Sequence, residues 1–425
     1  MLLTFVCQSW AETAAPLKAG VARVNLTPPL ELKAALGGYG ARLSKPAIGV
    51  HDNVWVKALV VVRGGQQFAV VTADVLAFPP QFKAAVIQRL AAEGWTADQV
   101  MLLPSHAHTS LDMMALHPGN TFGIPQVGVF HKALFEHTAD QLARAIREAG
   151  QKPVAVRAGT TMVTIPDRNR NRRPGGATHD TDLTVTRVDT AEGKPLAVLV
   201  NWTAHPTFMD EADMLFSGDW PGHLQRTLEA LIGQGVIAMF YNGAEGDQSP
   251  TPPPDCGSNW ERAERYGRAM GIEAWQVWQK VRLVEIKVFG YHTETIPLPK
   301  RTWHPDFMKT GGAEYALNET MMESFLEHLQ PTQTRSTCFR MGELVILGVP
   351  GEMAAGLGME TKAKAREITR ASSVTIGGLA DEWVSYILPA ADYRTGGYEA
   401  SVSFYGETLG TTIVNGVLRA AEGLK

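Results

Sequence analysis

The chain has 425 residues, of which 45% are hydrophobic and 19% are charged. Its 39 lysines and arginines nearly balance 43 aspartates and glutamates, so the net charge of −4 gives no reason to expect the basic face that nucleic-acid binding requires. The length suffices for a large core without disulfide or metal staples, and no apolar run reaches the roughly 20 residues of a membrane span. We therefore expect a soluble globular protein.

The N-terminal residues 1–18 have two interpretations. Leu2–Val6 resembles the end of the apolar core of a signal peptide, with small residues near Ala11 that suit cleavage. The basic segment that normally precedes such a core is missing, so a disordered tail is the second interpretation. With a signal peptide the mature protein begins near Lys18 and is periplasmic or secreted; without one we expect a cytoplasmic protein.

Strands and helices alternate along the rest of the chain. Runs rich in β-branched or alternating apolar residues predict strands at residues 20–25, 54–62, 68–73, 100–104, 154–163, 183–188, 197–202 and 236–240. Helical periodicity covers residues 80–93, 131–149, 221–231, 259–281 and 351–368. This order predicts an α/β fold in which helices flank a mixed β-sheet core. We expect a single catalytic domain over residues 19–425, although the more strand-like residues 282–345 would also suit a separate lobe.

The three cysteines, Cys7, Cys256 and Cys338, form no CxxC pair, which argues against a cysteine-ligated zinc site. One bridge between Cys256 and Cys338 remains open. The Pro- and Gly-rich residues 250–259 read as a surface loop rather than a linker.

Three polar motifs directly follow predicted strands. His106 and His108 come after residues 100–104, His205 comes after residues 197–202, and NGAEGDQSP comes after residues 236–240. In α/β sheets, ligand sites collect at the carboxyl ends of strands, so we expect these motifs to converge. Two histidines two residues apart share one face of an extended segment, and imidazole is the commonest metal ligand. Surface or core histidines would give the same pattern.

A catalytic zinc site usually includes an oxygen donor or a third nitrogen, and keeps one position for water. Several acids lie beside glycine or at strand ends and are candidate ligands: Asp74, Asp219, Glu245, Asp247 and Glu352. Spacing alone does not choose among these five. Glu352 is predicted at a helix start, where an acid also stabilises the helix dipole.

Two further motifs have simple structural explanations beside functional ones. Ser249 lies in a Gly-rich turn that is not a GxSxG elbow, so a serine-hydrolase role has little support. Residues 167–174 (DRNRNRRP) contain four arginines, which would hold a substrate carboxylate or headgroup, or simply form a solvated basic loop. No P-loop and no GxGxxG motif supports nucleotide chemistry.

Taken in order, the motifs resemble the N-terminal catalytic domain of the neutral/alkaline, non-lysosomal ceramidase family. The resemblance runs over AGVARVNLTPP, LGGYG, GVH, SHAH, NWTAHPT, SGDWPG, FYNGAEGDQSP, GVPGE and EWVSYILPAADYRTGGYEAS, and so covers nearly the whole chain. Each motif is short, but nine in the family's order are specific together.

The resemblance implies a site that spacing does not. It implies one zinc ion bound by His106, His205, Glu352 and Tyr386. It implies further that Tyr398 stabilises an oxyanion and that His108 faces the substrate. Ser249 matches a serine of the family's GDxSP motif, beside the metal or in contact with substrate, and Arg172 matches an arginine near the pocket. The alternative is a purely structural role, in which Glu352 is an acid at a helix start and Tyr386 a tyrosine of the core.

The sequence also departs from the family. The family's [ST]HTHSGP is SHAHTSLDM here, its NRSP is NRRP, and we expect no immunoglobulin-like C-terminal domain because the sequence ends at Lys425. The resemblance therefore implies a zinc-dependent hydrolase that cleaves an amide of a ceramide-like N-acyl lipid, or an ester, by metal-activated water. The alternatives are a promiscuous zinc esterase, lactonase or phosphotriesterase that does not act on ceramide, and a non-catalytic module that binds lipid or glycan. The substrate would be a small molecule or a lipid at a membrane surface, and the sequence is silent on oligomeric state.

Overall fold

A computed structural model describes residues 15–425 of the chain. The prediction for the signal or tail falls mostly on residues 1–14, which lie outside the described part. Leu17 is already buried in the core and the first strand begins at Lys18, so the folded region starts slightly before the predicted boundary at residue 19.

The centre of the fold is a mixed sheet of eight strands in the order β11-β9-β8-β6-β1-β3-β4-β5. The pairs β4–β5 and β9–β11 are parallel and the other neighbours are antiparallel. This confirms the predicted mixed α/β class. The strands are β1 (Lys18–Asn25), β3 (Trp55–Arg63), β4 (Gln66–Ala73), β5 (Val100–Pro104), β6 (Val154–Thr164), β8 (Asp182–Thr190), β9 (Pro195–Trp202) and β11 (Ile237–Asn242).

A second sheet has four strands in the order β13-β14-β15-β17. These are β13 (Phe289–Pro297), β14 (Gln333–Met341), β15 (Leu344–Gly348) and β17 (Ser373–Gly377). Its inner face packs on the large sheet: the rings of Phe68 in β4 and Phe339 in β14 stack with centroids 4.7 Å apart. Residues 282–345 thus supply strands to this second layer, and one apolar cluster contains side chains from both sheets.

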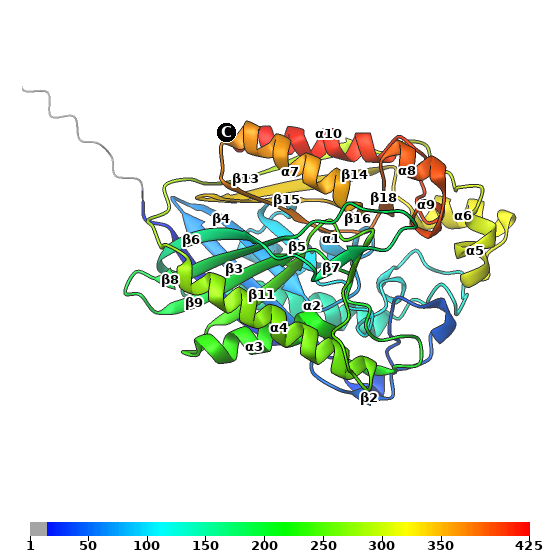
Figure 1. The fold of residues 1–425 in the computed structure, drawn as a ribbon, viewed down its shortest axis with the longest axis horizontal. Coiled ribbons are helices and arrows are strands. Elements are labelled where there is room, and N and C mark those ends of the chain that lie inside the picture. The colour runs from blue at the N-terminus through cyan, green and yellow to red at the C-terminus, as the bar shows by residue number, and fades with distance from the viewer. Residues whose placement is uncertain (1–14) are drawn as a thin grey trace, which may run out of the picture.

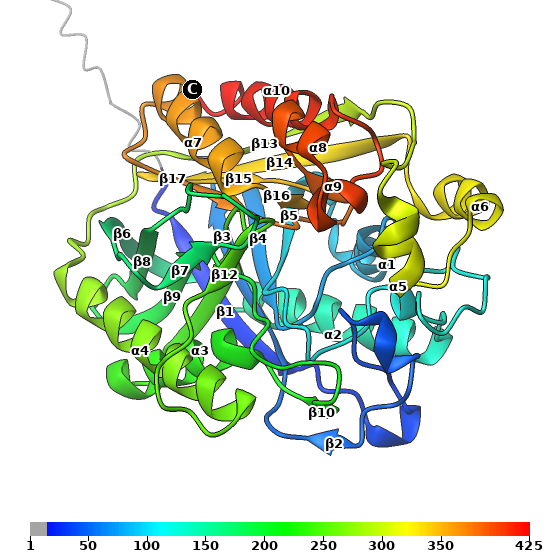
Figure 2. The same cartoon turned by 45° about the vertical axis from the view of Figure 1, so that its right-hand side comes forward.

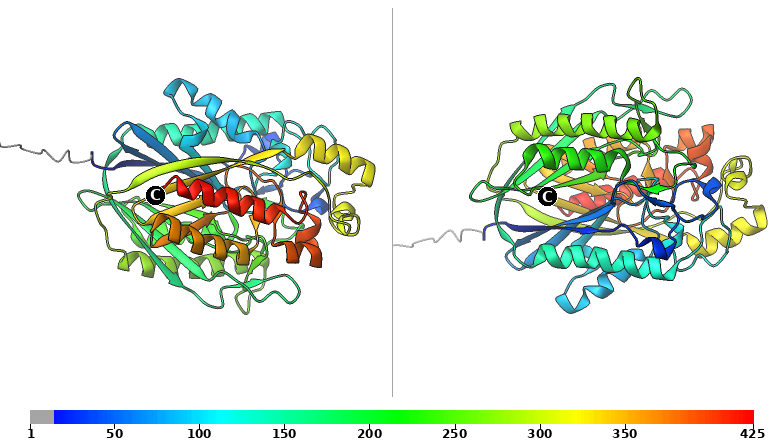
Figure 3. Two further views of the ribbon diagram at one scale, coloured as in Figure 1. Left: turned by 90° about the horizontal axis from the view of Figure 1, so that it is seen from above. Right: turned by 90° about the horizontal axis from the view of Figure 1, so that it is seen from below.

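Helices cover the outer faces of the two sheets. The small sheet carries α7 (Ala355–Thr369) and α10 (Leu409–Glu422), while α2 (Lys132–Gly150), α3 (Asp219–Ile232) and α4 (Asn259–Lys280) lie on the far side of the large sheet (Figures 1 and 3). The order of layers is therefore helices, small sheet, large sheet, helices. No helix in the described range 15–425 combines the length and apolar character of a membrane span.

The amphipathic pattern explains why the predicted helices form. Along α2 the buried residues include Leu134, Leu142 and Ile146, spaced at helical intervals on the face toward the large sheet. The hydroxyl of Ser258 accepts a hydrogen bond from the Glu261 backbone N–H and so caps the start of α4. The predicted helix at residues 80–93 divides into α1 (Phe82–Arg89) and a short 3₁₀ turn, Ala91–Glu93.

The prediction of a helix from residue 351 is wrong at its start. Helix α7 begins at Ala355, because Glu352–Met353 form a short strand, β16, that pairs in parallel with β18 (Tyr386–Ile387). Glu352 is therefore not a helix-start acid. The remaining short elements are β2 (Gly49–Val50), β7 (Asn169–Asn171), β10 (Leu215–Phe216), β12 (Gln248–Pro250), α5 (Gly311–Glu314), α6 (Glu319–Leu329), α8 (Ala390–Thr395) and α9 (Tyr398–Ser401).

Two smaller expectations also meet the structure. Cys256 and Cys338 are both free, so the bridge that the sequence left open is not formed. Residues 251–258 form an irregular loop between β12 and α4, in agreement with the predicted surface loop.

Candidate metal centre

Three chain segments meet where strands β5 and β9 end. His106 lies two residues beyond β5, His205 lies three residues beyond β9, and Glu352 projects from β16. The rings of His106 and His205 have centroids 4.8 Å apart, and all three side chains are buried. Figure 2 turns this end of the sheets toward the viewer, with α8 and α9 close to it. The convergence expected from the sequence is present.

Backbone carbonyls orient two of the imidazoles. His106 Nδ1 lies 2.8 Å from the Leu76 carbonyl oxygen, and His205 Nδ1 lies 3.0 Å from the Gln248 carbonyl oxygen. A carbonyl only accepts hydrogen bonds, so Nδ1 carries the proton in each ring and Nε2 presents a lone pair. This arrangement is typical of metal-binding histidines, whose second nitrogen donates to a carbonyl or carboxylate.

The four facing atoms have the spacing of metal ligands. His106 Nε2 lies 3.3 Å from His108 Nε2 and 3.3 Å from Glu352 Oε2, and His205 Nε2 lies 3.0 Å from Glu352 Oε2. Ligands of a tetrahedral ion at 2.0–2.1 Å lie about 3.3–3.4 Å from one another. With Nε2 of His106 and His205 unprotonated, their lone pairs face a carboxylate oxygen, and a cation is what makes this contact favourable. The donor set fits zinc.

The backbone at His106 holds an unusual conformation. Its φ of +72° lies in the left-handed region, which costs a residue other than glycine free energy. Two hydrogen bonds fix it: the Ser105 N–H donates to the Ala73 carbonyl and the His106 N–H donates to the Val75 carbonyl. The turn places the imidazole where its Nδ1 meets the Leu76 carbonyl oxygen.

Burial keeps His108 and His205 neutral. It lowers the pKa of His205 to about 3, with the nearby Arg172 guanidinium adding to the effect. Burial likewise lowers the pKa of His108 well below its ordinary value, and the neighbouring His106 lowers it further. Neutral imidazole is the form that binds a metal, so neither group needs to lose a proton at neutral pH.

Glu352 and Tyr386 lie opposite each other in the β16–β18 pair. The Tyr386 hydroxyl accepts a 2.9 Å hydrogen bond from Arg172 Nη2, and Arg172 Nε donates to Glu399 Oε1 at 2.8 Å. Although burial lowers the pKa of Arg172, the neighbouring Tyr386, Glu399 and Glu352 raise it overall, so the guanidinium remains charged. Arg172 therefore holds the tyrosine beside the glutamate and supplies the positive charge next to it.

Tyr398 and Ser249 lie differently. Tyr398 begins α9, is 37% exposed and places its hydroxyl 3.3 Å from that of Tyr315, so it stands at the edge of the pocket. Ser249 sits in β12 opposite Arg170 of β7 and is not among the pocket-lining residues. From that motif it is the neighbouring Gln248 that contacts the centre, since its carbonyl accepts from both the His205 N–H and Nδ1.

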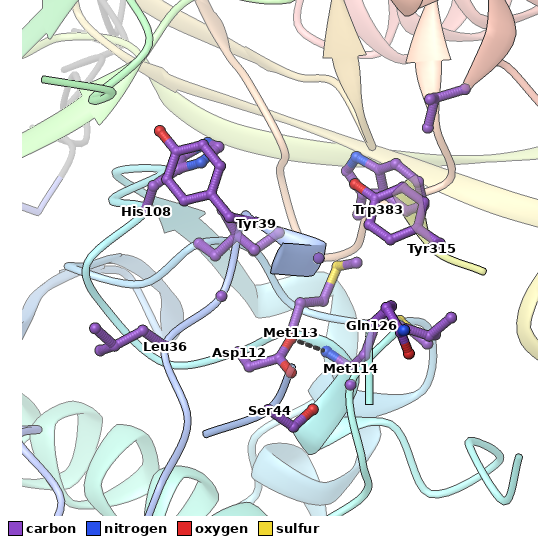
Figure 4. Close-up of a pocket in the computed structure, with 18 of the residues that line it drawn as sticks. Leu36, Tyr39, Ser44, His108, Asp112, Met113, Met114, Gln126, Tyr315 and Trp383 are labelled. Atoms are coloured by element: carbon purple, nitrogen blue, oxygen red, sulfur yellow. Dashed lines mark hydrogen bonds between the residues drawn. The ribbon is translucent and has the colours of Figure 1, made fainter. Parts of the chain in front are cut away.

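His106, His108, Glu352 and Tyr386 line a pocket of about 130 Å³. Most of its lining is apolar, and Figure 4 shows Met113, Met114 and Trp383 around it, with Tyr39 beside His108. Asp112 is the acid on the wall away from the histidines; it accepts a 2.9 Å hydrogen bond from the Met114 N–H (Figure 4). It falls in the LDM segment, one of the places where the sequence departs from the family's motif.

The sequence reasoning missed two contacts of the centre. Trp383 Nε1 donates a 2.8 Å hydrogen bond to Glu352 Oε1, and the Tyr39 ring packs against the His108 ring with centroids 5.2 Å apart. Both residues lie in motifs that carry the family resemblance, Trp383 in EWVSY and Tyr39 in LGGYG. Nothing in the spacing of the motifs indicated that Trp383 contacts Glu352 or that Tyr39 contacts His108.

Of the five candidate carboxylates, two reach the centre. Ligand atoms of His106, Glu245 and Glu352 lie within 4.8 Å of one another. The other three are engaged elsewhere: Asp74 accepts from the Trp55 N–H and Gln225, Asp219 accepts from the Trp220 N–H, and Asp247 accepts from the Ala355 N–H and Asn171.

Comparisons with known proteins agree with this picture. Residues 17–265 match the family described as neutral/alkaline non-lysosomal ceramidase, N-terminal. The neutral ceramidase of Drosophila melanogaster is 28% identical over 275 residues, which cover 59% of this chain and 38% of that protein. Neutral ceramidase A of Dictyostelium discoideum is 28% identical over 49% of this chain and 32% of that protein. The matches thus span about a third of these relatives' length.

Solved structures share the fold over almost the whole chain. The neutral ceramidase from Pseudomonas aeruginosa superimposes with a TM-score of 0.81 at 19% identity, covering 96% of this chain and 74% of that one. A structure described as "Ceramidase complexed with C2" gives a TM-score of 0.83 at 18% identity, covering 96% and 75%. At these identities the likeness shows the fold alone.

Proposed function

The chain belongs to the neutral/alkaline non-lysosomal ceramidase family, and on that premise we propose that it is a zinc-dependent hydrolase of a ceramide-like N-acyl lipid. The observation that carries the proposal is the set of three imidazole Nε2 atoms and one carboxylate oxygen, with contacts of 3.0–3.3 Å, beside a largely apolar pocket that His106, His108 and Glu352 line. His106, His205 and Glu352 would hold the ion, with Tyr386 beside them. When bound, zinc polarises a carbonyl group and activates water at neutral pH.

The residues around the centre have separate tasks in such a hydrolysis. Water adds its oxygen to the carbonyl carbon, the C–N bond breaks, and the leaving nitrogen needs a proton. The Tyr398 hydroxyl, at the edge of the pocket, would donate a hydrogen bond to the carbonyl oxygen as negative charge develops there. His108, in the pocket wall, would hold and transfer the proton that the leaving nitrogen takes. Arg172 acts through Tyr386, whose hydroxyl it binds.

The apolar wall would bind the acyl chain. Met113, Met114, Leu317, Phe325 and Phe404 line the pocket beside the centre. Burying methylene groups against such side chains favours binding by roughly 0.8 kcal/mol per CH₂. This supports an acylated substrate over a small polar one.

One observation favours a substrate other than ceramide. The Asp112 carboxyl lies in the same pocket, within a segment that departs from the family's motif. Asp112 accepts a hydrogen bond from the Met114 N–H, and an acyl group with a polar substituent would suit this acid better than a plain hydrocarbon chain. The second candidate is therefore a zinc esterase or lactonase that uses the same centre.

The decisive experiment measures metal content by elemental analysis together with hydrolysis of a fluorescent ceramide and of a chromogenic ester. About one zinc per chain and turnover abolished by a chelator would support the hydrolase. Turnover of the ester with an inert ceramide would assign the second candidate. A zinc-loaded preparation that retains no metal would overturn the mechanism and leave a lipid- or glycan-binding module.

A further inference from the structure

Glu245 is a carboxylate that the proposed mechanism does not use. It lies in the turn that follows β11, and its exposed fraction is 0%. Neither Oε1 nor Oε2 has a hydrogen-bond partner within the described residues. Buried carboxylates are normally paired or hydrogen-bonded, because removing one from water is costly.

The turn holds this side chain firmly against the centre. The Glu245 carbonyl accepts from the Gln248 N–H, and the Gly246 N–H donates to the Met353 carbonyl on β16. Glu352 lies on the same strand, β16, next to Met353. The hydrogen bond from Gly246 to Met353 therefore fixes the backbone positions of Glu245 and Glu352 relative to each other. A Cβ added at Gly378 would lie 2.4 Å from Glu245 Oε2, so even an alanine there would collide with the carboxylate. The side chain therefore cannot simply swing toward that wall.

The Glu245 carboxylate lies close to the ligand atoms of His106 and Glu352. Its ligand oxygen lies within 4.8 Å of His106 Nε2 or Nδ1 and of a Glu352 carboxylate oxygen. Since His106 Nδ1 is occupied by the Leu76 carbonyl, the nitrogen left for a ligand is Nε2. Two ligands on opposite sides of one ion lie up to about 4.4 Å apart, twice a bond of 2.0–2.2 Å, so a slight adjustment brings Glu245 within reach of an ion at His106 Nε2.

Burial raises the pKa of the Glu245 carboxyl well above its ordinary value, and the neighbouring Glu352 carboxylate raises it further. Two carboxylates this close together need a compensating positive charge, which a divalent cation supplies. The set also combines nitrogen donors, which suit zinc, with oxygen donors, which suit manganese.

We propose that Glu245 supplies a second carboxylate to this metal centre. The ion is then bound by His106, His205, Glu352 and Glu245, with Tyr386 and His108 next to it. This inference rests on the proposed function, since it presupposes that the centre binds metal. It adds a ligand that the resemblance to the family did not indicate, and it makes the centre neutral overall with a divalent ion.

The test compares Glu245→Gln with the unchanged protein by chelator-competition titration of Zn²⁺. The amide keeps the shape of the side chain but loses its charge and most of its affinity for the ion, so we expect the affinity to fall about 10- to 100-fold. Asp112→Asn is the matched control: it removes a carboxylate that is also buried but lies outside the donor cluster, and the affinity should stay within a factor of about three.

A second readout does not depend on affinity. The visible spectrum of the Co²⁺-loaded protein reports the number and kind of ligands, and it should change in Glu245→Gln but not in Asp112→Asn. If Glu245→Gln fails to fold, Glu245→Asp, which retains the charge on a shorter side chain, should bind Co²⁺ with an altered spectrum.

The outcomes separate the two proposals. If the unchanged protein binds neither Zn²⁺ nor Co²⁺, the hydrolase mechanism and this inference both fail. If it binds them and the glutamine variant has the same affinity and spectrum, only the role of Glu245 is overturned, and a buried water molecule is the partner of that carboxylate.

Discussion

Trp383 Nε1 donates a 2.8 Å hydrogen bond to Glu352 Oε1, while Glu352 Oε2 faces His106 and His205. The indole thus occupies one carboxylate oxygen and leaves the other directed at the imidazoles. Partners of this kind orient a metal ligand, and their removal typically costs about 10- to 100-fold in metal affinity.

Trp383→Phe should therefore weaken zinc binding by about tenfold, because phenylalanine retains the apolar ring but cannot donate the hydrogen bond. Chelator-competition titration measures the affinity, and thermal unfolding without metal checks that the fold persists. Trp275→Phe, on α4 away from the pocket, serves as the control. Equal affinities in Trp383→Phe and the unchanged protein would show that the indole does not orient the carboxylate.

His106→Ala should abolish metal binding and hydrolysis together. Metal ions contribute several kcal/mol to stabilisation of the transition state, so we expect turnover to fall by about 10³-fold or more. Metal content and initial rates are measured on the same preparation. His328→Ala, an exposed histidine on α6, is the control and should keep both. Activity that survives without metal would point to a different reaction centre.

Tyr398→Phe should lower kcat by about 10²- to 10³-fold with little change in KM or zinc content, because the lost hydroxyl acts on charge that develops in the transition state. Tyr315→Phe removes the hydroxyl that lies 3.3 Å from that of Tyr398 and should have a smaller effect. Steady-state kinetics with the preferred substrate measure both. A change confined to KM would assign Tyr398 to ground-state binding instead.

The pH dependence of the free energy of unfolding should reveal the raised pKa of the Asp112 carboxyl. Burial raises the pKa of its carboxyl to about 7, against hydrogen bonds from the Met114 and Ala115 N–H groups and the charge of Arg42. Because the folded-state pKa exceeds the unfolded value, this group's stabilising contribution is complete below about pH 4 and is lost as the pH rises to 7. Above pH 7 the cost of ionising it reaches a limit of about 4 kcal/mol.

Urea unfolding at pH 5 and pH 8 measures this effect. The free energy of unfolding of the unchanged protein, relative to Asp112→Asn, should be lower at pH 8 than at pH 5, since asparagine does not ionise. The m-value should stay constant between the two proteins. A difference that is independent of pH would mean that Asp112 is solvated or paired in the folded state.

Local patterns in the sequence were sufficient for most of the fold. The run at residues 100–104 predicted β5 with its observed bounds, and the periodicity at residues 131–149 predicted α2 to within one residue at each end. Strand β5 buries a continuous apolar run, and helix α2 buries an apolar stripe along one face. Both patterns can be recognised from residues that are close together in the sequence. The predicted helix start at Gly351 failed, because Glu352 pairs with Tyr386, a residue 34 positions away that no local pattern reveals.

The candidate metal centre likewise has features that the sequence indicated and features that only the tertiary structure decided. The sequence by itself determined that His106, His108 and His205 follow strands, and the order of its motifs determined the family. Spacing left five acids equivalent as ligands, and the resemblance to the family implied Glu352. The tertiary structure separates the five, since Asp74, Asp219 and Asp247 take hydrogen bonds elsewhere while Glu352 and Glu245 lie beside the His106 imidazole. The physical reason is that a ligand set consists of distances between atoms on separate segments, and only packing of those segments sets such distances.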